Sequence, residues 1–229
     1  MTRHGPRVVT IDGPAGVGKS TVASRLAARL GWAYLDTGAM YRAVTWAALN
    51  KGADLRRSEA VMAVIERTAF AFEADAETMR VRVDGVDVSE AIRDPELTGQ
   101  VRRVASLPAV RERLVAMQRA FAARQGRIVT EGRDQGTVAF PEAVCKFFLT
   151  AAVEERARRR QEQLAQAGRS VSWERLREDI ERRDASDCQR TVGPLRPAPD
   201  AVCVDTTDLT ADQVVDVMVE QVRARVSPD

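Results

Sequence analysis

The sequence predicts an α/β fold in which a parallel β-sheet is covered by helices on both faces. A glycine-rich phosphate loop lies between an apolar strand and a helical pattern. Short apolar segments recur farther along the chain, each followed by a helix, which is typical of a parallel sheet. The length of 229 residues and the hydrophobic content of 45% suit one α/β domain, residues 1–229, that carries small insertions.

The phosphate loop has the complete pattern G-x-x-x-x-G-K-[ST] in residues 13–20, directly after the apolar run Val8-Val9-Thr10-Ile11. Its glycines allow a tight turn whose N–H groups point inward, and the positive end of the next helix favours polyphosphate anions. We expect Lys19 to reach the β and γ phosphates and Ser20 to bind a magnesium ion. This motif predicts a nucleoside triphosphate site, which motors, switches and kinases share.

The remaining core elements follow in order along the chain. Helical spacing continues from the loop to Gly31, a suitable C-terminal cap, and a short strand at 33–35 precedes a second helix. We expect three further strands, at 128–130, 146–149 and 201–204, each with a helix after it. The last helix begins with the capping box Thr210-x-x-Gln213.

Two segments interrupt this alternation. Residues 68–93 contain stretches of period two and an Asp84-Gly85 turn, which predict a small antiparallel insert. Residues 154–172 begin with an Arg-rich helix on which Arg156, Arg159 and Arg160 share a face. This helix is either a solvated surface helix or a mobile lid that closes over a transferring phosphate.

Composition restricts the partners of the chain. The formal net charge of +2 argues against a nucleic-acid-binding surface, and no apolar run is long enough to span a membrane. The three cysteines lack metal-binding spacing, and the N-terminus lacks an apolar signal core, so we expect a reduced cytoplasm. We expect small nucleotides as ligands and a monomeric protein.

Three further segments carry a more specific signal. They are Asp36-Thr37-Gly38-Ala39-Met40-Tyr41-Arg42, Glu131-Gly132-Arg133-Asp134-Gln135-Gly136-Thr137 and Arg183-Asp184-x-x-Asp187-x-x-Arg190-x-x-x-Pro194-Leu195. Together with the phosphate loop, they resemble the bacterial-type cytidylate kinases over nearly the whole chain. The resemblance implies transfer of the γ phosphate of ATP, with Mg²⁺, to CMP or dCMP. It also implies a P-loop nucleoside monophosphate kinase fold with an acceptor-binding insert at 68–93 and a helical lid at 154–172.

The same resemblance assigns roles to individual residues. Those that would bind ATP are Gly13, Pro14, Ala15, Gly16, Val17, Gly18, Lys19, Ser20 and Thr21. Those that would act on the transferring phosphate are Lys19, Arg133, Arg156, Arg159 and Arg160. The acceptor phosphate would be bound by Arg42, Arg93, Arg133 and Arg190, with Thr37 and Tyr41 shaping its pocket. The ribose would meet Arg183 and Asp187, and the base would meet Arg111 and Asp134.

The assignment of Asp134 to the base agrees with its chemistry. An ionised carboxylate only accepts hydrogen bonds, and the exocyclic amine of cytosine donates them, whereas uracil has a carbonyl at that position. Several guanidinium groups would also offset the repulsion between two phosphorylated substrates and fix their geometry. We expect no dedicated base, and the sequence leaves open whether Asp134 or Asp36 contacts the water shell of the metal or takes a proton.

Arg102 departs from the family pattern, which usually has a serine there that contacts cytosine. An arginine only donates hydrogen bonds, so it tolerates the carbonyls of uracil as well as the acceptors of cytosine. Ser106, one helical turn later, is a candidate to compensate. Our hypothesis is that CMP remains preferred through Asp134, with weaker discrimination against UMP.

Two other classes of function remain as alternatives. One is another small P-loop kinase that acts on UMP, AMP or a non-nucleotide acceptor. The other is a nucleotide-dependent switch or ATPase, which the sequence disfavours. The only asparagine, Asn50, is not part of a guanine-reading N-K-x-D motif, and no strand ends in an Asp-Glu pair.

Overall fold

The computed structural model describes residues 5–74, 78–166 and 168–226. Positions 75–77 of the predicted insert and position 167 of the predicted lid therefore lie outside the described residues. Five strands form a parallel sheet in the order β2-β6-β1-β7-β8. Their bounds are β1 Arg7–Asp12, β2 Ala33–Asp36, β6 Arg127–Gly132, β7 Cys145–Thr150 and β8 Val202–Asp205. The predicted parallel sheet is confirmed.

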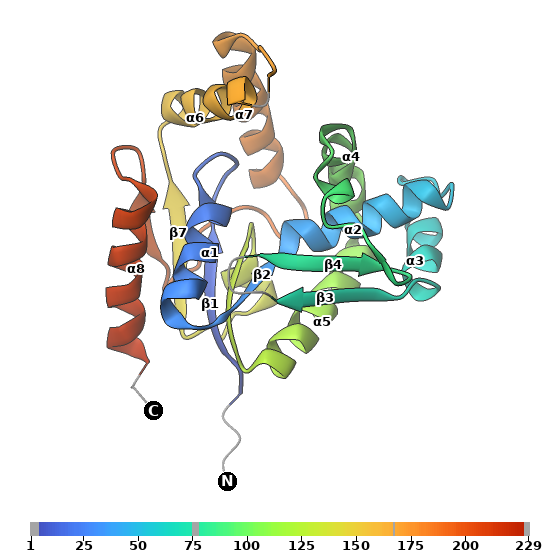
Figure 1. The fold of residues 1–229 in the computed structure, drawn as a ribbon, viewed down its shortest axis with the longest axis horizontal. Coiled ribbons are helices and arrows are strands. Elements are labelled where there is room, and N and C mark those ends of the chain that lie inside the picture. The colour runs from blue at the N-terminus through green and yellow to red at the C-terminus, as the bar shows by residue number, and fades with distance from the viewer. Residues whose placement is uncertain (1–4, 75–77, 167, 227–229) are drawn as a thin grey trace.

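The two faces of this sheet bury separate apolar clusters because side chains alternate along each strand. Val8 and Ile128 belong to one cluster, while Val9, Ile11 and Val129 belong to the other. The first cluster is covered by α2 (Thr37–Asn50) and α5 (Pro108–Gln125), and the second by α1 (Lys19–Leu30) and α8 (Ala211–Arg225) (Figure 1). This arrangement is the helix-covered α/β sheet that the sequence predicts.

Local sequence signals account for the ends of several helices. Gly31 ends α1 with φ at 65°, and its N–H bonds to the carbonyls of Ala27 and Ala28. Thr210 and Gln213 form the predicted capping box at the start of α8. Helix α4 (Pro95–Ala105) begins with a proline after the capping side chain of Asp94, and α3 (Ser58–Glu66) lies between α2 and the small sheet in sequence.

A second, antiparallel sheet comprises β3 (Phe70–Ala74), β4 (Met79–Val83) and β5 (Val86–Asp87). Asp84 and Gly85 both have positive φ, as the tight turn between β4 and β5 requires. Val81 and Val83 are buried in the same cluster as Met40 of α2, so this sheet packs beside α2. A short 3₁₀ turn, η1 (Ala91–Arg93), then leads into α4.

Two helices, α6 (Val153–Gln166) and α7 (Trp173–Cys188), stand beyond the carboxyl ends of the strands (Figure 1). They share an apolar cluster of Ala157, Leu176 and Ile180 that is separate from both clusters of the sheet. The segment 154–172 therefore covers α6 and its connection to α7, and α7 packs with it. In the described part of the chain, no helix is both long and apolar enough to cross a membrane.

Candidate functional site

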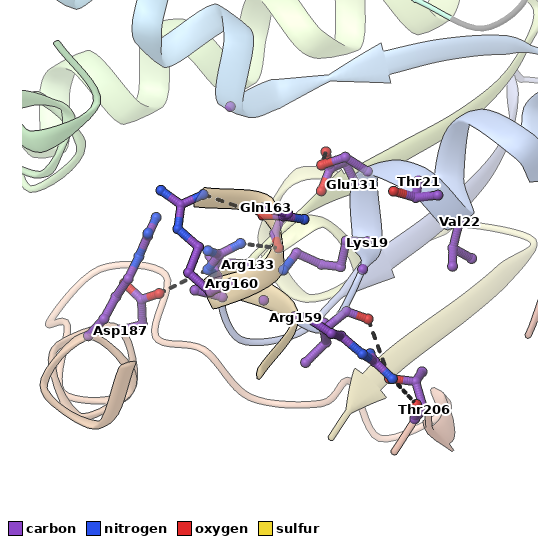
Figure 2. Close-up of a pocket in the computed structure, with 18 of the residues that line it drawn as sticks. Lys19, Thr21, Val22, Glu131, Arg133, Arg159, Arg160, Gln163, Asp187 and Thr206 are labelled. Carbon is purple, nitrogen blue, oxygen red and sulfur yellow. Dashed lines mark hydrogen bonds and ion pairs between the residues drawn. The ribbon is translucent and has the colours of Figure 1, made fainter. Parts of the chain in front are cut away.

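A cavity of about 980 Å³ lies where the carboxyl ends of the strands meet. The phosphate loop lines one side of the cavity. Another side is lined by the start of α2, the end of α4 and the turn after β6. Residues of α6, α7 and the loop after β8 complete its wall (Figure 2). Segments distant in sequence thus converge on one space large enough for two small ligands.

The phosphate loop is shaped by its glycines. Gly16 and Gly18 have φ of 83° and 87°, and a side chain on Gly13 would collide with the carbonyl group of Leu149 in β7. The Nζ atom of Lys19 donates a hydrogen bond to the Pro14 carbonyl oxygen at 2.6 Å. The loop therefore folds around the lysine that follows it.

Lys19 is a buried cation, and burial lowers its pKa well below the ordinary value. The positive charge of Arg133 lowers this pKa further, whereas the carboxylates of Glu131 and Asp12 raise it. An anion placed in the cavity would act in the same direction as these carboxylates. The ammonium group is thus held where a phosphate would relieve its desolvation.

Glu131, at the end of β6, is a site residue that the sequence did not single out. Its Oε1 atom accepts hydrogen bonds from the Ser20 hydroxyl and, at 3.0 Å, from the Tyr34 hydroxyl. Burial and the Glu131 charge raise the pKa of Tyr34, so this phenol stays protonated. Glu131 is itself buried, and the described residues supply no Lys or Arg ion pair to it. The sequence could have indicated Glu131 through its position at the carboxyl end of a predicted strand, because such ends lie beside the phosphate loop in a parallel sheet.

Two ion pairs, one partly buried and one buried, lie on the other side of the cavity. Asp36 caps α2 by accepting from the Ala39 N–H at 2.8 Å, and its second oxygen accepts from Arg42 at 2.8 Å. Arg111 of α5 pairs with Asp134, and both side chains are less than 10% exposed. Burial nonetheless raises the pKa of Asp134, with the charge of Arg111 opposing that effect.

Tyr41 and Gly193 lie against the Arg111–Asp134 pair, and Thr37 lines the same cavity. The guanidinium of Arg111 lies 5.9 Å from the centre of the Tyr41 ring, and burial raises the pKa of Tyr41 to about 12. Thr37 donates to the Glu131 carbonyl oxygen at 2.7 Å. A side chain on Gly193, whose φ is 63°, would collide with both members of the pair. The sequence offered no signal for Gly193 because that contact forms only in the folded chain.

Asp187 of α7 binds two arginines that line the cavity, Arg133 and Arg190. Its Oδ2 atom accepts from Arg133 at 2.9 Å, and its Oδ1 atom accepts from Arg190 (Figure 2 shows Arg133 and Asp187). Arg183 also lines the cavity, and the Asp187 charge acts on it, but the described residues supply no direct ion pair to it. Burial, together with the positive charge of the neighbouring Arg133, lowers the pKa of Arg183 to about 10. An anionic ligand would supply the missing countercharge.

Arg102 and Arg93 lie at the edges of this arrangement. Arg102, on α4, is exposed and lines the cavity. Ser106 donates to the Arg103 carbonyl oxygen and is not among the residues that line the cavity, so the structure does not bring it to the site. Arg93 lines an adjoining space of about 470 Å³, to which Arg42 also contributes.

The three lid arginines differ in their surroundings. Arg160 lines the cavity and donates to Gln163 at 3.4 Å, while Arg159 also lines it and donates to Glu155 and to Thr206 (Figure 2). Arg156 is buried outside the cavity lining. It pairs with Asp184 at 2.6 Å and donates to the Ala15 carbonyl oxygen of the phosphate loop at 3.2 Å.

Fold and site together define a P-loop kinase of the nucleoside monophosphate kinase type. The cytidylate kinase family model matches residues 9–224, and the chain belongs to the cytidylate kinase family.

Two curated relatives and one solved structure illustrate the match. The cytidylate kinase of Azotobacter vinelandii (strain DJ / ATCC BAA-1303) is 47% identical over 222 residues, which cover 96% of each chain. The bifunctional pantoate ligase/cytidylate kinase of Synechococcus sp. (strain JA-2-3B'a(2-13)) is 48% identical over 93% of this chain and 40% of its own length. An uncharacterized protein of Eubacterium ventriosum ATCC 27560 shares the fold, with a TM-score of 0.55, 12% identity and coverage of 96% and 99% of the two chains.

Arg156→Ala is expected to destabilise the fold, because it leaves the Asp184 carboxylate without its partner and detaches α6 from the phosphate loop. The loss should be about 3 kcal/mol of unfolding free energy, at the lower end for a broken buried pair, since Asp184 is partly exposed. Urea unfolding measures it. The matched control is Arg160→Ala on the same helix, which should change stability by no more than about 0.5 kcal/mol. Equal stability of the two variants would contradict the anchoring of α6 by Arg156.

Proposed function

We propose that this chain transfers the γ-phosphoryl group of ATP to the 5′ phosphate of CMP or dCMP, giving ADP and CDP or dCDP. One observation carries the proposal. A single cavity holds a phosphate loop at one end and, at the other, a buried Asp134 carboxylate beside arginines gathered on Asp187. A phosphate donor and a phosphorylated pyrimidine acceptor fit these two ends.

ATP is proposed to bind the loop residues 13–21, with Lys19 on the β and γ phosphates. Lys19 and the arginines Arg133, Arg159 and Arg160 border the same space, where negative charge moves during transfer. Fixed cations there stabilise the transition state without reorganising at the moment of reaction. Arg156 is also proposed to contribute to catalysis; its buried contacts support an effect through the position of α6 and the loop.

Mg²⁺ is proposed as the metal, held by the Ser20 hydroxyl and the Glu131 carboxylate. This donor set fits because Mg²⁺ prefers oxygen ligands, and Glu131 is a buried carboxylate to which the described residues supply no direct ion pair, although the Lys19 charge acts on it. When bound with ATP, the metal would neutralise phosphate charge. In the described part of the chain, no group of three or more acidic, His or Cys side chains could hold a metal alone, which agrees with a metal that arrives with the nucleotide.

The acceptor is proposed to place its phosphate among Arg42, Arg93, Arg133 and Arg190, with Thr37 and Tyr41 at its pocket and Arg183 and Asp187 at the ribose. The base would meet Arg102, Arg111 and Asp134. Each carboxylate here already fixes an arginine, so the guanidinium groups keep their geometry before the acceptor enters. Asp134 is proposed to accept from the amine of cytosine, a contact that would favour cytosine over uracil.

The proposal treats residues 1–229 as one kinase domain that acts as a monomer in the cytoplasm on small nucleotides. Within it, residues 68–93 form the acceptor-binding insert, because η1 of this segment supplies Arg93. Residues 154–172 form a mobile lid, since α6 belongs to an apolar cluster separate from the sheet. A lid that closes over both nucleotides would exclude water from the transfer.

ADP formation from MgATP, measured with CMP, dCMP, UMP, AMP, GMP or no acceptor, tests the proposed function. Strong stimulation by CMP and dCMP, with slow ADP release in the absence of an acceptor, is the expected result. Stimulation by none of these nucleotides, or rapid ADP release without any acceptor, would overturn it.

Lys19→Ala is expected to lower turnover by roughly 10² to 10⁴ with the fold intact, because it removes a cation from the transferring phosphate. Steady-state kinetics with CMP and circular dichroism measure the two parts of this expectation. Lys51→Ala is the matched control, since Lys51 lies outside the cavity and bonds to Thr68 and Asp84. Turnover of Lys19→Ala close to that of the control would refute the role of Lys19.

Arg102→Ser is expected to lower the UMP/CMP ratio of kcat/KM by roughly 3- to 10-fold, the range that one hydrogen bond supplies. The reason is that the Arg102 guanidinium meets carbonyl oxygens of either base, whereas a serine hydroxyl can also accept. Arg103→Ser is the control, because Arg103 follows on α4 without lining the cavity. A ratio that stays the same or rises in Arg102→Ser would contradict the hypothesis.

A further inference from the structure

The turn that carries Arg133 and Asp134 has an unusual backbone. These residues lead directly into η2 (Gln135–Ala139), a single π-helical turn. Such turns are rare and occur often at functional sites. The orientation of η2 decides where Arg133 and Asp134 stand, so whatever fixes η2 also fixes the acceptor side of the cavity.

Charged side chains of opposite sign hold the two ends of η2. At its start, the two oxygens of Asp12 accept from the backbone N–H groups of Gln135 at 2.9 Å and Gly136 at 2.8 Å. At its end, Arg119 of α5 donates to the carbonyl oxygens of Ala139 at 2.8 Å and Val138 at 2.9 Å. This polarity matches the free N–H and C=O groups of a helical turn.

Packing leaves η2 little freedom to move. A Cβ atom on Gly136 would lie 3.0 Å from the Thr10 hydroxyl oxygen and 3.3 Å from the Lys146 side chain, so the turn rests directly on β1 and β7. The Gln135 side chain is buried, and its Oε1 atom accepts from Thr130 at 3.1 Å. Asp12 is thus one of several contacts on η2, and it is the one directly adjacent in sequence to the phosphate loop.

Asp12 is 4% exposed and, in the described part of the chain, has no ion pair with Lys or Arg. Burial raises its pKa to about 6, although both N–H bonds lower it, so the carboxylate is ionised at neutral pH. A buried carboxylate whose hydrogen bonds come from two adjacent N–H groups has a narrowly defined position. Asp12 also ends β1 immediately before Gly13, the first residue of the phosphate loop.

We propose that Asp12 is a positioning residue that fixes Arg133 and Asp134 relative to the phosphate loop, and thereby contributes to acceptor binding and selection without contacting the acceptor. This inference rests on the proposed function. Because Asp12 acts through η2, its loss weakens the contacts of both Arg133 and Asp134. The kcat/KM for an acceptor whose base contacts Asp134 should therefore fall more than the kcat/KM for an acceptor whose base does not.

Asp12→Asn tests the proposal, with Thr10→Val as the matched control. The asparagine keeps the shape but directs an amide NH₂ at one of the two N–H groups. It is expected to raise the KM for CMP about 10-fold and to lower the CMP/UMP ratio of kcat/KM about 3-fold or more. Thr10→Val alters the same strand against the same Gly136, and the Thr10 hydroxyl is a buried group without a hydrogen-bond partner, so both quantities should stay unchanged.

The CMP/UMP ratio separates positioning from other effects of the substitution. A lower folded fraction, or a weaker field on Lys19, changes the rates for both acceptors equally and cancels in the ratio. If Asp12→Asn yields no folded protein, Asp12→Glu replaces it as the test variant. This substitution keeps the charge but displaces it by one methylene. It should raise the KM for CMP in the same way.

The outcomes are distinct. Unchanged KM and ratio in folded Asp12→Asn, or an equal effect of Thr10→Val, would overturn the positioning role while CMP phosphorylation by the wild type stands. A wild type that CMP does not stimulate would remove the proposed function and this inference with it.

Discussion

The site depends on keeping several arginines close together in one cavity before any anion is bound. Like charges at short range repel strongly where water is excluded, so such a cluster forms only with compensation. Asp36, Asp134 and Asp187 provide it: each holds at least one guanidinium group, and Asp187 holds two. These carboxylates leave a net positive wall whose geometry is set in advance.

The compensation is incomplete, and the remaining positive charge acts on the buried cations in addition to their burial. Burial and the charge of Arg133 both lower the pKa of Lys19 and of Arg183, which stand on different elements of the same cavity. A phosphorylated ligand that enters here removes a cost already present in the free protein. Binding free energy and electrostatic relief are therefore expected to be coupled, so a phosphorylated ligand should bind here more tightly than a neutral one.

The sequence predicted those features whose cause is local. The phosphate loop, the Asp84-Gly85 turn and the capping box at Thr210 each depend on residues a few positions apart, and each is present. The alternation of strands and helices likewise predicted the parallel sheet, because burial on both faces requires continuous apolar runs.

Two carboxylates whose contacts join distant parts of the chain were not singled out from the sequence. Glu131 matters through Ser20, far earlier in the chain, and Asp12 matters through Gln135 and Gly136. The residues next to Glu131 and Asp12 in the sequence form no motif that predicts these contacts. Arg156 shows the opposite case: it shares a helical face with Arg159 and Arg160 in sequence, yet packing places its guanidinium against Asp184. Helical periodicity predicts which side chains share a face of a helix, but their contact partners depend on how that helix packs in the fold.

The apolar cluster of α6 and α7 links the two ends of the site. Arg159 and Arg160 stand on α6 toward the phosphate loop, whereas Arg183 and Asp187 stand on α7 toward the acceptor side. Because Ala157, Leu176 and Ile180 pack together apart from the sheet, a displacement of one helix carries the other. Closure on the donor would then bring the acceptor contacts with it. Under the proposed function, the shared cluster would therefore couple the engagement of the two nucleotides through one unit rather than through two independent helices.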